Sequence, residues 1–379
     1  MIKSKLPHVS TTIFSVMSQL AQENNAINLA QGFPDFNTDS ELITRLNYYS
    51  TQNYNQYAPM FGVEKLRILL SEKFTKLYQS DYDFQNEINI TSGASQAIFN
   101  VISTLIHPND EVIIFEPAYD LYQPTVELFG GKVVPIKLKH PEYSIDFEEL
   151  KQKISAKTKL IVINNPNNPT GRILSEEDLK QFEKIISETN AYILADEVYE
   201  HITFDEKKHQ SFAQLKSIKD RVFIVGSFGK LFHITGWKIG YVLAEKELMK
   251  EFRKCHQFNV FSTHTPSQYA LADYMENAEH YLHLNQFFQE KRDFFIEGLQ
   301  QTKFEILPCE GTYFLSANYA KLSDLNDVDF ATKLTKEYKV ATIPFSAFYQ
   351  DKTDHNIIRF CFAKKNETLE QALEKLSKL

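Results

Sequence analysis

Short apolar runs alternate with helix-length segments through the first two thirds of the chain, and this alternation constrains the fold more than any other feature. Runs typical of buried strands occur at 88–91, 111–115, 132–136, 159–163, 191–195 and 222–225. Segments whose apolar residues recur with helical spacing lie between them, at 97–106, 120–129 and 176–188. Buried strands separated by helices indicate an α/β fold with a mostly parallel central sheet flanked by helices.

The pattern changes after about residue 245. Long amphipathic helices are expected at 266–278 and 280–301, followed by strands near 304–307, 313–315 and 357–362 and helices at 328–338 and 367–378. This order indicates a smaller α+β domain. We therefore expect three parts, which are an N-terminal segment (1–36) packing on the small domain and the active site, a large domain (37–270) and a small C-terminal domain (271–379).

Composition excludes several classes of protein. The formal net charge of −8 over 379 residues argues against nucleic acid or an anionic membrane as a partner. The three cysteines lie far apart and no metal-ligand spacing occurs, so no metal site is expected. The N-terminus lacks the apolar region of a signal peptide, and no apolar run reaches the length of a membrane span. A cytoplasmic protein is expected.

Candidate functional residues cluster where the predicted strands end. In open α/β sheets, ligands bind at the carboxyl ends of the strands. The positions that fall there are Ser92, Gly93, Ala94, Ser95, Tyr119, Asn168, Asp196 and Lys230. The turn at 92–96 feeds a helix N-terminus, which suits a phosphate or carboxylate, although an ordinary capped helix fits this turn equally well.

Lys230 follows the predicted strand at 222–225 through small and hydroxylated residues. Desolvation lowers the pKa of an amine, and a neutral amine can form a Schiff base with an aldehyde. Most of the 41 lysines and arginines of the chain are expected to be solvated surface charges, so Lys230 alone does not establish catalysis.

Four motifs, in order, resemble those of the class I aminotransferases, enzymes of fold type I that use pyridoxal 5'-phosphate (PLP). They are Asn-Asn-Pro-Thr-Gly at 167–171, Asp-Glu-Val-Tyr at 196–199, Ser-Phe-Gly-Lys at 227–230 and Ile-Arg-Phe at 358–360. The resemblance covers nearly the whole chain from residue 11. The stretches at 31–36, 56–59 and 232–238 are similar to the methionine and kynurenine aminotransferase branch, and most of all to bacterial methionine aminotransferases.

The resemblance implies roles for residues around PLP, which the large domain would bind. Lys230 would form the Schiff base with PLP and then act as general base, while Asp196 would pair with the pyridine nitrogen. Asn168 and Tyr199 would hydrogen-bond the phenolate oxygen, and Tyr119 would stack on the ring. The phosphate would be held by residues 92–95, by Ser227 and Lys238, and by Tyr57 of a second subunit. Many class I members have arginine where this chain has Lys238, and we interpret the lysine as a phosphate contact of point-charge type.

The resemblance also implies how substrate is bound by a homodimer with shared active sites. Arg359 would clamp the substrate carboxylate, with Gly32 and Asn168 beside it. Phe14, Tyr119 and Phe261 of the second subunit would line an apolar pocket suited to methionine and aromatic amino acids. A 2-oxo acid would accept the amino group in a ping-pong reaction.

Three alternatives stay open at this stage. One is kynurenine aminotransferase activity. Another is a β-lyase acting on cysteine S-conjugates, because the same carbanion can expel a β-substituent. The last is a non-catalytic PLP-binding protein, which the presence of the full catalytic set disfavours.

Overall fold

The structure is a computed structural model that describes residues 2–379. Its larger sheet has seven strands in the order β2-β8-β7-β6-β5-β3-β4. Only β8 runs antiparallel to its neighbours, which are β2 and β7. The prediction of a mostly parallel α/β sheet is therefore confirmed. The strands are β2 Ile88–Thr91, β3 Glu111–Glu116, β4 Lys132–Lys137, β5 Thr158–Asn164, β6 Tyr192–Asp196, β7 Val222–Ser227 and β8 Gly240–Ala244.

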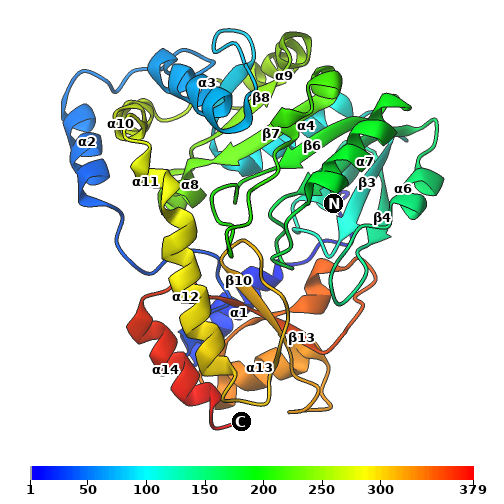
Figure 1. Ribbon diagram of the computed structural model, residues 1–379, viewed down its shortest axis with the longest axis vertical. Helices are drawn as coiled ribbons and strands as arrows, with labels where there is room; N and C mark the ends of the chain where they lie inside the picture. Colours follow the sequence, from blue (N-terminus) through cyan, green and yellow to red (C-terminus); the bar gives the residue numbers. More distant parts are fainter. Residues whose placement is uncertain (1) are drawn as a thin grey trace.

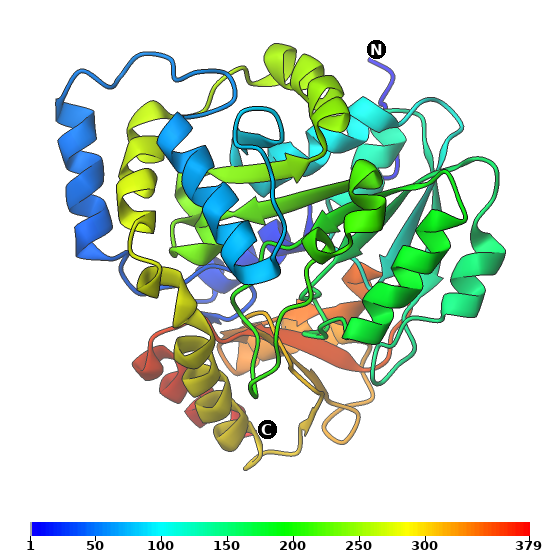
Figure 2. The ribbon, with the colours of Figure 1, turned by 45° about the horizontal axis from the view of Figure 1, so that its top comes forward.

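Both faces of this sheet are buried, as the continuous apolar runs require. Alternate residues of β3 show the division, because Val112 and Ile114 join one core and Ile113 and Phe115 join the other. Helices cover both faces in Figures 1 and 2. One core includes residues of α4 Gly93–Leu105, α5 Tyr122–Leu128 and α9 Lys246–Asn259, and the other includes residues of α3 Glu64–Tyr78, α6 Phe147–Lys153 and α7 Glu176–Ser187.

Shorter elements complete this part of the chain. Helix α10 packs against α2 and α3 at the side of the sheet that carries β2 and β8 (Figure 1). The remaining helices here are α2 Ser40–Thr51, α8 Phe228–Leu231, α10 Thr265–Met275 and α11 Glu279–Leu282, with 3₁₀ turns η1 Phe212–Gln214, η2 Lys216–Arg221 and η3 Thr235–Trp237.

A second, antiparallel sheet of four strands in the order β12-β13-β10-β9 lies in the C-terminal part. The N-terminal segment packs here, because β1 pairs in parallel with β11 and α1 lies against α13. The domain boundaries at residues 36 and 270 stay predictions. The elements are α1 Ile13–Glu23, β1 Ile27–Asn28, α12 Leu284–Leu299, β9 Glu305–Ile306, β10 Phe314–Asn318, α13 Asp327–Glu337, β11 Val340–Ala341, β12 Ile343–Pro344, η4 Phe345–Phe348, β13 Ile357–Cys361 and α14 Asn366–Leu376.

The prediction of a single helix at 280–301 is wrong. The structure has two helices there, α11 and α12, with a break at His283. Tyr281 and Leu284 on either side of the break are both buried. Their spacing of three residues continues a helical apolar pattern, so the sequence gives no sign that the chain turns there. Within residues 2–379, no helix has the length and apolar character needed to cross a membrane.

Candidate active site

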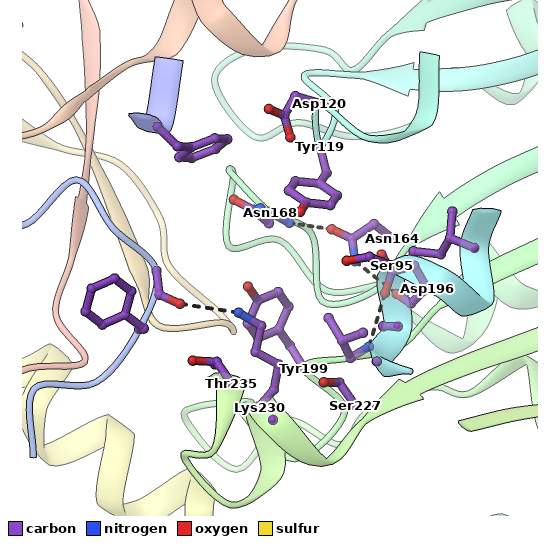
Figure 3. A pocket seen from close by; sticks show the side chains of 18 of the residues that line it. Ser95, Tyr119, Asp120, Asn164, Asn168, Asp196, Tyr199, Ser227, Lys230 and Thr235 are labelled. Atoms are coloured by element: carbon purple, nitrogen blue, oxygen red, sulfur yellow. Dashed lines mark hydrogen bonds between the residues drawn. The ribbon is translucent and has the colours of Figure 1, made fainter. Parts of the chain in front are cut away.

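A cavity of about 460 Å³ opens at the carboxyl ends of the central strands. Three of its lining residues mark these ends directly, because Asn164 closes β5, Asp196 closes β6 and Ser227 closes β7. Figure 3 shows the side chains that converge there. Parallel strands present their carboxyl ends at one edge, so residues distant in sequence meet in one pocket.

Lys230 lies in the short helix α8, directly after β7, and its amine enters the cavity. The Nζ atom donates to the hydroxyl of Tyr313 at 2.7 Å and to the carbonyl of Gly32 at 3.3 Å. Burial lowers the pKa of Lys230 to about 8. About a tenth of such amines are neutral at pH 7, whereas an ordinary lysine is almost entirely protonated.

Asp196 is buried at the end of β6. The hydroxyl of Tyr122 donates to its Oδ2 at 2.6 Å, and the backbone N–H of Val198 donates to Oδ1 at 3.3 Å. Burial raises the pKa of Asp196 to about 6, against the two hydrogen bonds that lower it. The group is therefore an anion at neutral pH in a site that favours a cationic partner.

Arg359 is fully buried in β13 and faces the same cavity. Its guanidinium donates to Asn168 Oδ1 at 2.6 Å and to the carbonyl of Ala30 at 3.0 Å, and it stacks 3.7 Å from the ring centre of Phe314. Burial lowers the pKa of Arg359 to about 10, so the group stays charged at neutral pH. Its Nε atom has no hydrogen-bond partner in residues 2–379. A buried cation with an unused donor suits an anionic ligand.

The N-terminus of α4 forms a second polar wall. Gly93 has φ +75°, in the left-handed region, and a Cβ there would lie 3.4 Å from Lys238 Nζ. A Cβ on Gly240 would lie 2.8 Å from the backbone nitrogen of Ala94. Glycines thus let the segment of Lys238 and Gly240 approach the first turn of α4 closely, and the N–H groups of a first turn have no partner within their own helix. With Ser227 and Lys238 beside it, this wall has the polar groups that typically bind an anion.

Most residues predicted from the sequence do line this cavity. They are Phe14, Gly32, Gly93, Ala94, Ser95, Tyr119, Asn168, Asp196, Tyr199, Ser227, Lys230, Lys238 and Arg359. Ser92 lies outside the lining at the N-cap position of α4, where its side chain makes no capping hydrogen bond and its backbone N–H donates to Gln96 Oε1. Tyr57 and Phe261 also lie outside the lining, with 85% and 40% of their surface exposed and their ring centres 5.6 Å apart.

Several residues of the site were not singled out from the sequence. Tyr122 holds Asp196, and Tyr313 holds Lys230. Asn164 accepts the backbone N–H of Asn168 at 2.7 Å, and its position at the end of a predicted strand was a usable signal. Asp120 also lines the cavity, where it accepts a hydrogen bond from Thr12 at 2.7 Å.

These features define an α/β enzyme site in which a half-buried amine, a buried carboxylate and a buried guanidinium face one small-molecule cavity. The sequence model described as aminotransferase class I and II matches residues 24–376. The chain therefore belongs to the class I and II aminotransferase family and has the fold of the fold-type I, PLP-dependent transferases. It is a transaminase, and enzymes of this family and fold generally depend on PLP and act on amino acids and 2-oxo acids.

Similar proteins include a methionine aminotransferase from Escherichia coli, which is 43% identical over 100% of this chain and 98% of its own length. A crystal structure from E. coli, described as having a methionine aminotransferase function, matches with a TM-score of 0.98 over 100% of both chains, at 43% identity. A kynurenine–oxoglutarate transaminase from Dictyostelium discoideum is 33% identical over 97% of this chain and 94% of its own length.

Proposed function

We propose that this chain is a PLP-dependent aminotransferase that moves the amino group of methionine and of aromatic amino acids to a 2-oxo acid by a ping-pong mechanism. The observation that carries the proposal is the meeting of Lys230, Asp196 and Arg359 around one cavity. The 43% identity with the E. coli methionine aminotransferase supports the choice of methionine.

The donor set of the cavity fits PLP. The partly neutral amine of Lys230 suits its aldehyde, and the buried anion Asp196 suits a protonated pyridine nitrogen. The glycine-lined N-terminus of α4, with Ser227 and Lys238, suits its phosphate. The remaining ring contacts would come from residues that line the same cavity, namely Tyr119, Asn168 and Tyr199. PLP, when bound, supplies an electron sink that makes the α-hydrogen of the amino acid acidic.

The protein's own groups would position the substrate and move the proton. The guanidinium of Arg359, with Asn168 and the Gly32 backbone, would hold the α-carboxylate. This fixes the α-carbon, so that Lys230 Nζ takes its proton from one amino acid and returns a proton to the α-carbon of the next product. The ring of Phe14 lies 5.3 Å from the Arg359 guanidinium and would shield the carboxylate from water.

The aromatic and charged groups at the cavity favour a substrate whose side chain is uncharged. Phe14 and Tyr119 supply aromatic surface, and Arg359 is the single arginine of the lining in residues 2–379. A distal carboxylate would meet Asp120 instead of a second guanidinium (Figure 3). Apolar pockets separate similar side chains weakly, by about 1–3 kcal/mol per methylene, so we expect breadth. The D. discoideum relative makes kynurenine a second candidate donor.

The active sites of two subunits would be shared. Tyr57 and Phe261 form a solvent-exposed aromatic pair in the single chain. Large exposed aromatics that meet one another are typical of an interface. In a homodimer, Tyr57 would reach the phosphate and Phe261 would line the substrate pocket of the second subunit.

An absorbance spectrum before and after addition of L-methionine tests the proposal. A band at about 400 nm, in the region where PLP bound to a protonated Schiff base absorbs, should move to shorter wavelength as the amine form accumulates. The Lys230→Ala protein should show no such change. An unchanged band would reject methionine, and the absence of any such band after addition of PLP would reject the proposed role of Lys230. Pyruvate and ammonia released from a cysteine S-conjugate would identify β-lyase activity.

A further inference from the structure

Tyr313, which precedes β10, joins the Lys230 amine to the Gly32 segment. Its hydroxyl donates to the Gly32 carbonyl at 2.6 Å and accepts from Lys230 Nζ at 2.7 Å. Lys230 Nζ also lies 3.3 Å from the Gly32 carbonyl oxygen. Only 1% of the Tyr313 surface is exposed, so bulk solvent does not compete for these contacts. The amine therefore has two fixed acceptors in the protein.

The two acceptors match the hydrogens of a neutral amine. A neutral lysine has two N–H groups and one lone pair. With both N–H groups donated, to Tyr313 Oη and to Gly32 O, the lone pair is directed away from both acceptors. The Tyr313 hydroxyl cannot donate to this lone pair, because its hydrogen is used on Gly32. Burial raises the pKa of Tyr313 well above 10, which keeps that hydrogen in place.

We propose that Tyr313 is a positioning residue that holds the freed amine of Lys230 with its lone pair available for the α-hydrogen of the substrate. The inference rests on the proposed role of Lys230 as the base. Gly32, the second acceptor, also belongs to the proposed carboxylate site. The same segment would thus fix both the base and the carbon from which it takes the proton.

The ring and the hydroxyl of Tyr313 have separable functions. The ring packs edge-on against Tyr199 at 5.2 Å and lies 5.6 Å from the ring of Phe288. Phenylalanine would preserve this packing and remove only the hydroxyl. Tyr319 offers a matched control, because it is equally buried, stacks on Phe330 and donates its hydroxyl to the Leu325 carbonyl, away from the cavity.

Competitive labelling of the apoenzyme with acetic anhydride over a pH series, read by mass spectrometry of the Lys230 peptide, measures the amine pKa without substrate or cofactor. Acceptors stabilise the charged amine, so Tyr313→Phe should lower the pKa of Lys230, by about one unit for the loss of one hydrogen bond to a charged group. Tyr319→Phe should leave it unchanged. If the pKa of Lys230 is unchanged in Tyr313→Phe, the proposed contact between the Tyr313 hydroxyl and the Lys230 amine is wrong. This test does not depend on which amino acid donates the amino group.

The half-reaction with α-deuterated amino acid tests whether Tyr313 positions the base. A mispositioned base slows proton transfer, so Tyr313→Phe should reduce the rate about tenfold and enlarge the isotope effect. If Tyr313→Phe has the same rate and the same isotope effect as the wild-type enzyme, the proposal is wrong. If circular dichroism shows that Tyr313→Phe is unfolded, both measurements are made on Tyr313→Met, which lacks the same hydroxyl. Failure with methionine but success with phenylalanine as donor would reject the proposed substrate and leave this inference intact.

Discussion

At the scale of single residues, burial acts on the two central charges of the site in opposite directions. It lowers the pKa of Lys230 to about 8 and raises the pKa of Asp196 to about 6. At a pH between these two pKa values, Asp196 is mostly charged and part of the Lys230 population is neutral. The same desolvation therefore makes the amine more reactive at neutral pH and still leaves an anion for the pyridine nitrogen.

The first prediction concerns the pH dependence of PLP uptake by the apoenzyme. Below its pKa of about 8, Lys230 is mostly protonated and lacks the lone pair that attacks an aldehyde. The covalent uptake rate should therefore rise about tenfold per pH unit from pH 6 and level off above about pH 8. Stopped-flow absorbance measures this rate. Lys230→Ala, which binds PLP without the covalent step, corrects for titration of the cofactor itself, and a flat profile after correction would contradict the prediction.

The second prediction concerns Asp120, which lines the cavity and is hydrogen-bonded to Thr12. Its negative charge should disfavour glutamate relative to glutamine, which has the same shape and no charge. Asp120→Asn should raise the ratio of kcat/KM for glutamate over glutamine about tenfold, because it removes a like charge. Half-reaction kinetics give kcat/KM for glutamate and for glutamine. Thr12→Val removes the hydrogen bond and keeps the charge, so an equal change in that variant would assign the effect to the N-terminal segment.

The residues found from sequence and those missed differ in how they reach the site. Asp196, Asn168 and Lys230 follow strand ends or lie in local motifs, so their neighbours along the chain point to them. Tyr313 and Tyr122 act through contacts with residues 83 and 74 positions away. No local pattern encodes such a contact, because it exists only after the sheets have packed.

At the scale of elements, the strands β3 to β7 and the helices α4, α5 and α7 could be predicted because each carries its own apolar pattern, whereas helix α6 was not predicted. Strand β8 could not be placed, because its position between β2 and β7 depends on pairing with strands far apart in the chain. Helix α4 was expected from residue 97 but begins at Gly93. The first turn consists of small residues without apolar periodicity, and that turn forms the anion wall.

The third prediction tests this wall with Gly240→Ala. The added Cβ would lie 2.8 Å from Ala94 N and from Gly226 O, closer than such atoms approach. The variant should lose about 1–3 kcal/mol of stability, as other overpacked sites do, and bind PLP at least about tenfold more weakly. Thermal melting of the apoenzyme and a PLP titration measure the two effects. Gly236→Ala is the matched control, since nothing lies within 4 Å of its added Cβ.

At the scale of the whole molecule, the residues proposed for one site do not all line the cavity of one chain. Lys230 and Arg359 face the cavity, whereas Tyr57 and Phe261 lie outside its lining. If two chains complete each other's sites, each site contains Lys230 and Arg359 of one chain and Tyr57 of the other. In a hybrid dimer of one Lys230→Ala chain and one Tyr57→Ala chain, both defects then fall in the same site, and the other site is intact.

The last prediction follows from this arrangement. Lys230→Ala and Tyr57→Ala proteins should each be poorly active at limiting PLP, and subunit exchange in an equal mixture should restore about a quarter of wild-type activity, since half of the dimers are hybrids with one intact site. Activity after mild dissociation and reassociation measures this recovery. A mixture of Lys230→Ala with Arg359→Ala should recover nothing, because both residues belong to the same chain's part of each site. Equal recovery in both mixtures, or in neither, would contradict a site shared through Tyr57.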